Sequence, residues 1–157
     1  MENEEQHLLA DLEVNLVQAG SGKRLANYLI DLVVFYILLF CVGIVIGALD
    51  PNASEDLNSV SSLGTLADRL LTLICYGIYM GLVEGLFRGK SLGKVITGTR
   101  AVNEDGSRVS FKTGFLRGLY HAVPFDAFSA LGQPPYPWHD KWAKSYVIDE
   151  RRSSLPA

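Results

Sequence analysis

One apolar stretch near the amino end of the chain, residues 22–49, constrains the fold more than any other feature. After Arg24 it continues for about 25 residues, which is long enough to cross a ~30 Å hydrocarbon core with some tilt. The sequence therefore predicts a transmembrane helix over residues 24–49. A hydrophobic content of 48% and a mean hydropathy of +0.18 in 157 residues are typical of a small membrane protein.

A carboxylate, Asp31, lies roughly two helical turns inside this stretch. Insertion scales assign a carboxylate near a helix centre a cost of about +3 kcal/mol. About sixteen Leu, Ile, Val and Phe residues, at roughly −0.4 kcal/mol each, outweigh that cost. The helical period places Arg24, Asn27, Tyr28 and Asp31 on one stripe, and we expect this stripe to face protein or water.

A second apolar stretch, residues 66–87, is also long enough to span the membrane and carries Glu84 near its end. Basic residues flank the two ends that meet on one side, whereas the connecting loop, residues 50–65, is acidic. By the positive-inside rule we expect both termini and residues 88–157 on the cytoplasmic side of the cell membrane, and the loop on the outside. The whole chain, 1–157, is expected to form one domain with a polar tail over residues 1–19.

Glycines recur at four-residue spacing in both predicted spans, and such spacing lets another backbone approach closely. They are Gly43 and Gly47 in the first span and Gly77, Gly81 and Gly85 in the second. The two sets lie at different depths, so we expect them to make different contacts. The second set is expected to receive the polar stripe of the first helix. Gly43 with Gly47, or Gly77 with Gly81, is expected to contact a second copy of the chain, with ordinary lipid-facing positions as the alternative.

The segment after the two spans, residues 88–157, is expected to contain several short helical, strand and loop elements. Residues 96–102 are rich in β-branched side chains, and we expect Thr99–Val102 to pair with Ser145–Asp149 in a cytoplasmic β-ribbon. Apolar positions at helical spacing predict an interfacial or partly inserted helix over residues 112–131, broken near Pro124. Residues 133–138, with three prolines, predict a stiff loop at headgroup level. The fold class expected is an all-α membrane protein with two antiparallel transmembrane helices, this third helix and the ribbon.

Four segments of the chain carry a family resemblance. They read GKRLANYLIDLVV, EGLFRGKSLGKVITGTRAVNEDG, FLRGL and WHDKWAKSYVID, and they cover most of residues 20–149. Together they resemble the RDD family of small membrane proteins, named for one arginine and two aspartates. The resemblance implies that Arg24, Asp31 and Asp140 are the name-giving residues. It also implies that the activity is unassigned, with transport of ligands or cations suspected, and further matching positions are Glu84, Lys94, Gly98, Arg100 and Arg117.

We expect a polar cluster at the cytoplasmic boundary, formed by Arg24, Asp31, Asp140, Glu84, Arg117, Asn27 and Tyr79. Helix side chains lean toward the amino end, so Arg24 leans away from Asp31 and is available to hold Asp140. Another donor must then reach Asp31. The candidates are Arg117, the Tyr79 hydroxyl and a bound cation.

Two functions are compatible with such a cluster. In the first, it moves a proton, a cation or a small ligand through an oligomer, because two spans are too few to enclose a path. In the second, the cluster is structural and the chain is a membrane adaptor or assembly scaffold. The lipid bilayer, a second copy and a small ion or ligand are the expected partners.

Other functions are disfavoured by what the sequence contains. We expect no enzymatic activity, cofactor or metal centre, because only His7 and His121 accompany the His139-Asp140 pair. The RGKS sequence at Arg88–Ser91 lacks the earlier glycine of a phosphate-binding loop. A net charge of −3, without a basic arm, gives no indication of nucleic-acid binding.

Overall fold

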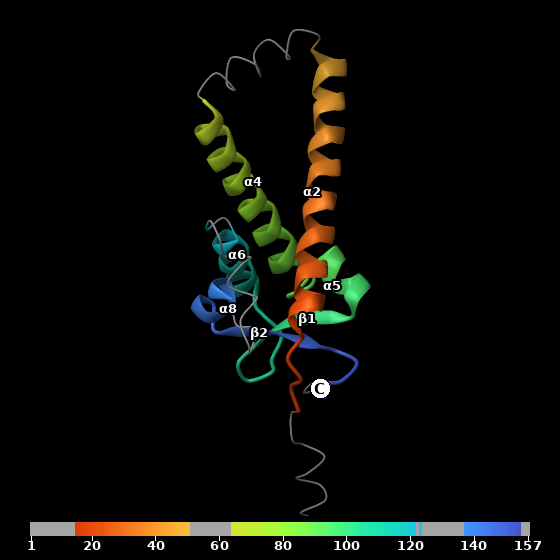
Figure 1. The fold of residues 1–157 in the computed structure, drawn as a ribbon, viewed down its shortest axis with the longest axis vertical. Coiled ribbons are helices and arrows are strands. Elements are labelled where there is room, and N and C mark those ends of the chain that lie inside the picture. The colour runs from red at the N-terminus through yellow and green to blue at the C-terminus, as the bar shows by residue number, and fades with distance from the viewer. Residues whose placement is uncertain (1–14, 51–63, 122, 124–136, 155–157) are drawn as a thin grey trace, which may run out of the picture.

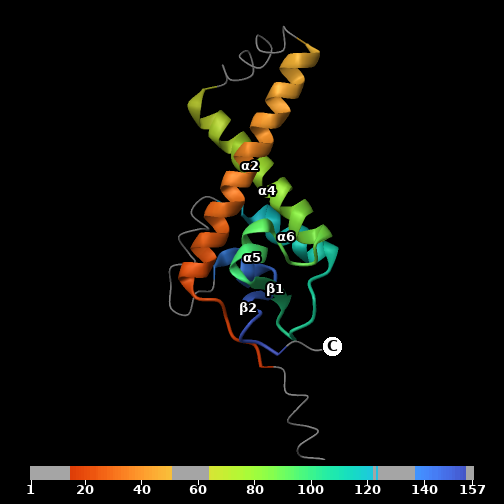
Figure 2. The ribbon, with the colours of Figure 1, turned by 90° about the vertical axis from the view of Figure 1, so that its right-hand side faces the viewer.

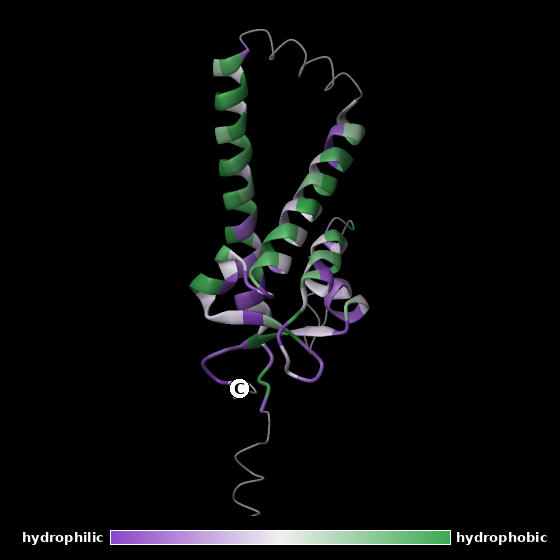
Figure 3. Cartoon of the chain, turned by 180° about the vertical axis from the view of Figure 1, so that it is seen from behind, coloured by the Kyte–Doolittle hydropathy of each residue, from purple (hydrophilic) through white to green (hydrophobic). Residues whose placement is uncertain are grey.

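The computed structural model describes residues 15–50, 64–121, 123 and 137–154. Two long helices, α2 (Ser21–Leu49) and α4 (Thr65–Leu86), run antiparallel and diverge from a smaller part of the molecule (Figures 1 and 2). We call this part the base; it consists of residues 15–20, 87–121 and 137–154, with the helix ends that they contact. Both are long and apolar enough to cross a membrane. Coloured by hydropathy, their far halves are predominantly hydrophobic, and the polar residues gather toward the base (Figure 3). The helices predicted over residues 24–49 and 66–87 are therefore confirmed as helices.

The two long helices touch through aromatic side chains near the base. The ring of Phe35 in α2 lies 5.3 Å from that of Tyr76 and 5.5 Å from that of Tyr79, both in α4. Phe35, Tyr76 and Met80 form a small buried cluster between the helices. Beyond this contact, residues 36–49 of α2 are all exposed. The pair is thus a V whose arms contact each other only near the base among the described residues.

A third helix, α6 (Phe111–Tyr120), covers the face of α4 that carries its glycines. A Cβ on Gly81 would lie 2.8 Å from the carbonyl oxygen of Phe115, and one on Gly114 would lie 2.7 Å from the nitrogen of Gly85. The expectation that this face receives the polar stripe of α2 is therefore wrong. With α6 against them, Gly81 and Gly85 cannot also contact a second copy.

At ten residues, α6 is about 15 Å long, too short to cross a bilayer, as expected for an interfacial or partly inserted helix. Its remainder was expected to continue past a break near Pro124. Residues 124–136, which include that break and most of the expected stiff loop, lie outside the described part of the chain.

A short helix, α5 (Leu92–Thr97), occupies part of the segment where a strand was expected over residues 96–102. The Ser91 side chain caps its amino end by accepting the Lys94 amide, and Gly98, at φ +69°, ends it in the left-handed region that glycine favours. Six residues are too few to show helical periodicity, so only these caps could indicate it. The strand begins one residue after the glycine.

The base contains a two-stranded antiparallel sheet of β1 (Thr99–Asn103) and β2 (Ser145–Asp149). Thr99 pairs with Asp149 and Ala101 with Val147, so the predicted β-ribbon is confirmed. The chain before α2 joins the same sheet through a bridge between Gln18 and Ile148. Helix α8 (Trp138–Trp142) comes directly before β2 in the chain, and its buried residues face α6. The base therefore ties the two ends of the described chain together.

Candidate functional site

Five buried charged side chains form a continuous chain of ion pairs in the base. We call Arg24, Asp140, Arg117, Glu84 and Lys94 the ion-pair network. Asp140 Oδ2 lies 2.5 Å from Arg24 Nη1, and its Oδ1 lies 2.5 Å from Arg117 Nη1. Arg117 Nε then contacts Glu84 Oε2 at 2.9 Å, and the Lys94 ammonium contacts the other Glu84 oxygen. The five residues belong to five elements, α2, α8, α6, α4 and α5.

Arg24 connects α2 to the carboxyl end of the chain. Besides Asp140 it donates to the carbonyl oxygens of Ala19, at 3.1 Å, and Val147, at 3.3 Å. The contact predicted between Arg24 and Asp140 is confirmed. It brings the His139–Asp149 segment against the first helix.

Arg117 lies at the centre of the network and is fully buried. It bridges Glu84 and Asp140 and also donates to the Ser145 hydroxyl. Its Nη2 has no hydrogen-bond partner among the described residues. Arg117 does not reach Asp31, so that suggested role is wrong. The glycine packing of α6 on α4 instead points Arg117 at Glu84.

Asp31 is 2% exposed and its carboxylate is held by α5. The Ser91 hydroxyl donates to Oδ2 at 2.6 Å, and the Gly93 amide donates to Oδ1 at 2.8 Å. A Cβ on Gly93 would lie 2.5 Å from the backbone oxygen of Asn27, so only glycine allows this approach of α5 to α2. These two donors take the place that was suggested for the Tyr79 hydroxyl. Tyr79 instead packs against Phe35.

Asn27 belongs to the same buried stripe of α2, as predicted. Its side-chain amide lies between the hydroxyls of Thr97, at 2.5 Å, and Thr99, at 2.9 Å. Arg24, Asn27, Asp31 and Phe35 are the buried residues of α2, at intervals of three and four. One face of α2 thus carries three polar residues, which are fixed by α8 and β2, by α5 and β1, and by α5 with its cap.

Asp140 and Arg117 titrate far from their ordinary ranges. Burial alone raises the pKa of Asp140, but Arg117, His139 and Arg24 outweigh it and hold this pKa at about 2. Burial also lowers the pKa of Arg117, and the carboxylates of Asp140 and Glu84 more than restore it, so the net shift is upward. Both groups therefore stay charged at neutral pH.

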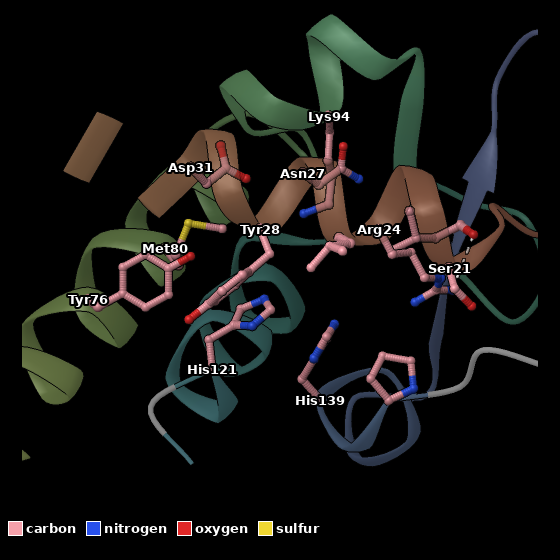
Figure 4. Close-up of a pocket in the computed structure, with 13 residues that line it drawn as sticks. Ser21, Arg24, Asn27, Tyr28, Asp31, Tyr76, Met80, Lys94, His121 and His139 are labelled. Carbon is pink, nitrogen blue, oxygen red and sulfur yellow. Dashed lines mark hydrogen bonds between the residues drawn. The ribbon is translucent and has the colours of Figure 1, made fainter. Parts of the chain in front are cut away.

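A cavity of about 60 Å³ lies between α2 and the α6–α8 pair (Figure 4). Figure 4 shows His121 and His139 on one wall, with Asp31, Asn27 and Arg24 of α2 on the other. The two imidazole centroids are 4.1 Å apart. His139 Nε2 lies 3.3 Å from Asp140 Oδ1, and His121 Nε2 lies 3.7 Å from Glu84 Oε1. Each imidazole therefore contacts a carboxylate of the ion-pair network.

Several members of this site were not predicted from the sequence. Ser91 had a signal, a serine directly before an apolar run, which is a helix-cap pattern. Tyr76, and the approach of His121 to His139, depend on how the helices are rotated, and no local pattern reports that rotation. Within the residues that the structure describes, no three His, Cys, Asp or Glu side chains are grouped to hold a metal ion.

The chain is similar in sequence to two proteins of Bacillus subtilis. It is 32% identical to the uncharacterized protein YckC of Bacillus subtilis (strain 168) over 68% of its own length and 64% of that protein's. It is 33% identical to the uncharacterized protein YxaI of the same organism over 66% of its length and 74% of that protein's. The chain thus spans a little under two thirds of the first relative. No solved structure matches it. Residues 18–144 match the model of the RDD family, and the chain belongs to that family.

Proposed function

We propose that α2 and α4 cross the cell membrane, with both termini in the cytoplasm and the base at the inner surface. Exposed apolar side chains at the level of the base support this placement. On α5 they are Leu92, Val95 and Ile96, between 50% and 61% exposed. On α8, across the base in Figure 1, Trp138 and Trp142 stack at 6.1 Å. Aromatic and apolar side chains gather in this way at membrane–water interfaces.

Cysteine labelling tests the topology. A cysteine placed at Ser153, in an otherwise cysteine-free chain, is expected to react with a membrane-impermeant maleimide only after the cytoplasmic side is opened. A cysteine at Asp50, at the far end of α2, should react from the outside. Labelling of both positions from one side would overturn the arrangement of two spans.

We further propose that the chain is a membrane scaffold in which the ion-pair network is structural. The observation that carries this proposal is that the charges of the buried cluster sum to zero. Among the described residues, the network and Asp31 contain three cations, Arg24, Lys94 and Arg117, against three carboxylates. Asp31, which would be the natural cation ligand, already accepts one hydrogen bond at each oxygen. No ion is needed to complete the cluster.

A scaffold needs surfaces for partners, and the diverging arms of the V supply them. Nothing lies within 4 Å of a Cβ built on Gly43 or Gly47, and the residues around them are exposed. Lipid or another membrane helix must cover this part of α2. We propose that a second copy packs there, because glycines four residues apart let helices approach closely.

Mass measurement tests the scaffold. Light scattering in mild detergent should give an oligomer for the unmodified chain and a smaller particle for the double variant Gly43→Ile, Gly47→Ile. The matched control is Val42→Ile with Ile46→Val, which leaves the glycines in place on the same helix. An unchanged mass in the glycine variant would remove this contact.

A second candidate is transport of a small ligand or ion through such an oligomer. One observation favours it: the cavity lined by Arg24, Asp31 and the two histidines at the cytoplasmic end of the spans. If the cluster belongs to a transport path, Asp31→Asn should abolish flux in proteoliposomes while the protein stays folded. If the cluster is structural, the same change should mainly lower the melting temperature.

A further inference from the structure

Apart from two histidines, the charged side chains that line the cavity between α2 and the α6–α8 pair are two cations and one carboxylate. The cations are Arg24 and Lys94, and Tyr76 is a further lining residue. The carboxylate in the lining is that of Asp31, and both of its oxygens already accept bonds from α5. Figure 4 shows this carboxylate turned toward α5, away from the two imidazoles. A ligand that brings acceptor oxygens therefore fits the cavity better than a cation.

Tyr76 gives an independent indication of such a ligand. Its side chain is 4% exposed, and its hydroxyl has no hydrogen-bond partner among the described residues. Figure 4 shows its ring reaching from α4 toward Asp31 and Met80 of the cavity wall. A buried hydroxyl without a partner is costly, so native proteins usually provide one. An anionic oxygen in the cavity would accept this hydrogen bond.

The net charge of the buried cluster determines what must bind together with the anion. With neutral imidazoles, the three cations and three carboxylates of the buried cluster sum to zero. A lone anion would leave one buried charge uncompensated, which is strongly unfavourable. Histidine is the side chain whose ordinary pKa, about 6.5, allows it to gain a proton near neutral pH. His121 and His139 are both in the lining and can supply the missing positive charge.

The groups around the imidazoles favour that protonation. Glu84 of α4 faces His121 and Asp140 of α8 faces His139, at 3.7 and 3.3 Å. From α6, Arg117 opposes protonation, but it is paired with both of these carboxylates. From α2 and α5, Arg24 and Lys94 are likewise each paired with a carboxylate. The cavity wall also contains two phenols, those of Tyr28 and Tyr76.

We infer that this cavity binds one small oxyanion, a carboxylate or a phosphate-like group, together with one proton held by the His121–His139 pair. A volume of about 60 Å³ holds roughly four water molecules, enough for a group of this size. The site is distinct from the scaffold role and does not depend on it. A free anion and an anionic lipid headgroup present the same chemistry at this depth.

Binding and proton uptake are measured together by calorimetry on the full chain in maltoside detergent, which carries no anionic group. Acetate and formate are the probes, because each carries one negative charge and neither titrates between about pH 6 and about pH 8. Titrations at about pH 6 and at about pH 8, each in two buffers of different ionisation enthalpy, give the affinity of the anion and the number of protons taken up. We expect close to one proton per anion near pH 8, and affinity about tenfold or more lower there than near pH 6. Nanodiscs containing phosphatidylglycerol without added anion form the second arm, in which histidine NMR signals report protonation.

Variants separate the two parts of the inference. Tyr76→Phe should weaken anion binding about fivefold and leave proton uptake intact, whereas Tyr36→Phe, on the exposed face of α2, should change neither. His121→Gln with His139→Gln should remove the pH dependence, and melting curves verify that each variant is folded. Uptake on phosphatidylglycerol alone would identify the headgroup as the anion. The inference fails if the unmodified chain binds neither probe nor headgroup with proton uptake, or if sodium binds and releases a proton.

Discussion

Gly118 of α6 lies directly against Gly81 of α4, so closely that a Cβ on Gly118 would overlap the backbone of its partner. A second pair, Gly114 and Gly85, repeats the contact one turn away. Together they bring the two helix backbones into contact without intervening side chains. This proximity lets Arg117, between the two glycines of α6, reach Glu84 of α4 at 2.9 Å.

Replacing Gly118 by alanine should therefore separate α6 from α4 and strain the ion pair between Arg117 and Glu84. We expect a loss of about 1–3 kcal/mol or more, the usual cost of inserting a methyl group into a packed contact. The melting temperature in detergent measures it. Gly22→Ala in α2 is the control, because a Cβ there meets nothing within 4 Å and alanine favours the helix. Equal melting temperatures for the two variants would contradict the contact.

Asp140→Asn should be among the most destabilising conservative changes in the chain. It leaves Arg24 and Arg117 buried without the carboxylate that both contact at 2.5 Å. Breaking a buried pair from one side costs about 3–5 kcal/mol. Chemical unfolding measures the loss, and Glu104→Gln, on an exposed turn, should stay within about 0.5 kcal/mol of the unmodified chain. A small effect of Asp140→Asn would mean that the network contributes little.

The contribution of Asp31 can be isolated by comparing two helix caps. Ser91→Ala removes the cap of α5 and also the hydroxyl that donates to Asp31 at 2.6 Å. Ser110→Ala removes only the cap of α6, where the hydroxyl accepts the amide of Thr113. The second change should cost about 1 kcal/mol. The first should cost about 1–3 kcal/mol more, since one oxygen of a buried carboxylate loses its donor. Equal losses would show that Asp31 does not need the hydroxyl.

Acid should weaken the base of the molecule in a defined pH range. The pKa of Asp140 is about 2 in the folded chain, against about 3.9 for an unperturbed aspartate. A pKa lowered by folding means stability that is complete above about pH 5 and lost as the pH falls through 4 toward 2. The share from Asp140 is about 2 kcal/mol. Asp149, whose pKa is lowered by the hydrogen bond from Lys23, acts in the same direction.

Melting temperatures between about pH 6 and about pH 3 measure this dependence. The curve for Asp140→Asn should be flatter than that of the unmodified chain, because the group responsible is gone. Parallel curves would assign the acid sensitivity to other carboxylates.

The large elements could be predicted because long apolar stretches and alternating strands leave their periodicity in the sequence. The pairing of Arg24 with Asp140 was also predicted. The resemblance to the RDD family singled out both residues, and the direction in which helical side chains lean left Arg24 available. The partner of Asp31 could not be predicted. Half of its coordination is the backbone amide of Gly93, and every residue other than proline has such an amide.

The partner of the α4 glycines was predicted wrongly for a related reason. Glycines at four-residue spacing indicate that another backbone approaches closely, but they do not indicate which segment of the chain provides it. Here α6 carries matching glycines, Gly114 and Gly118, and it excludes α2 from that face. Two matching glycine motifs in one chain are a signal that sequence reasoning can use.

The wide separation of Arg24 from Asp140 along the chain, 116 residues, has a consequence for biosynthesis. When the first helix leaves the ribosome, the carboxylate that will neutralise Arg24 has not yet been made, and neither has Arg117, the partner of Glu84. In the proposed topology, both spans therefore enter the bilayer with these charges unpaired, and the base closes around them only after Asp140 has been synthesised. Any truncation before Asp140 should then yield a nascent chain whose inserted helices still present unpaired charges to the quality-control machinery of the membrane.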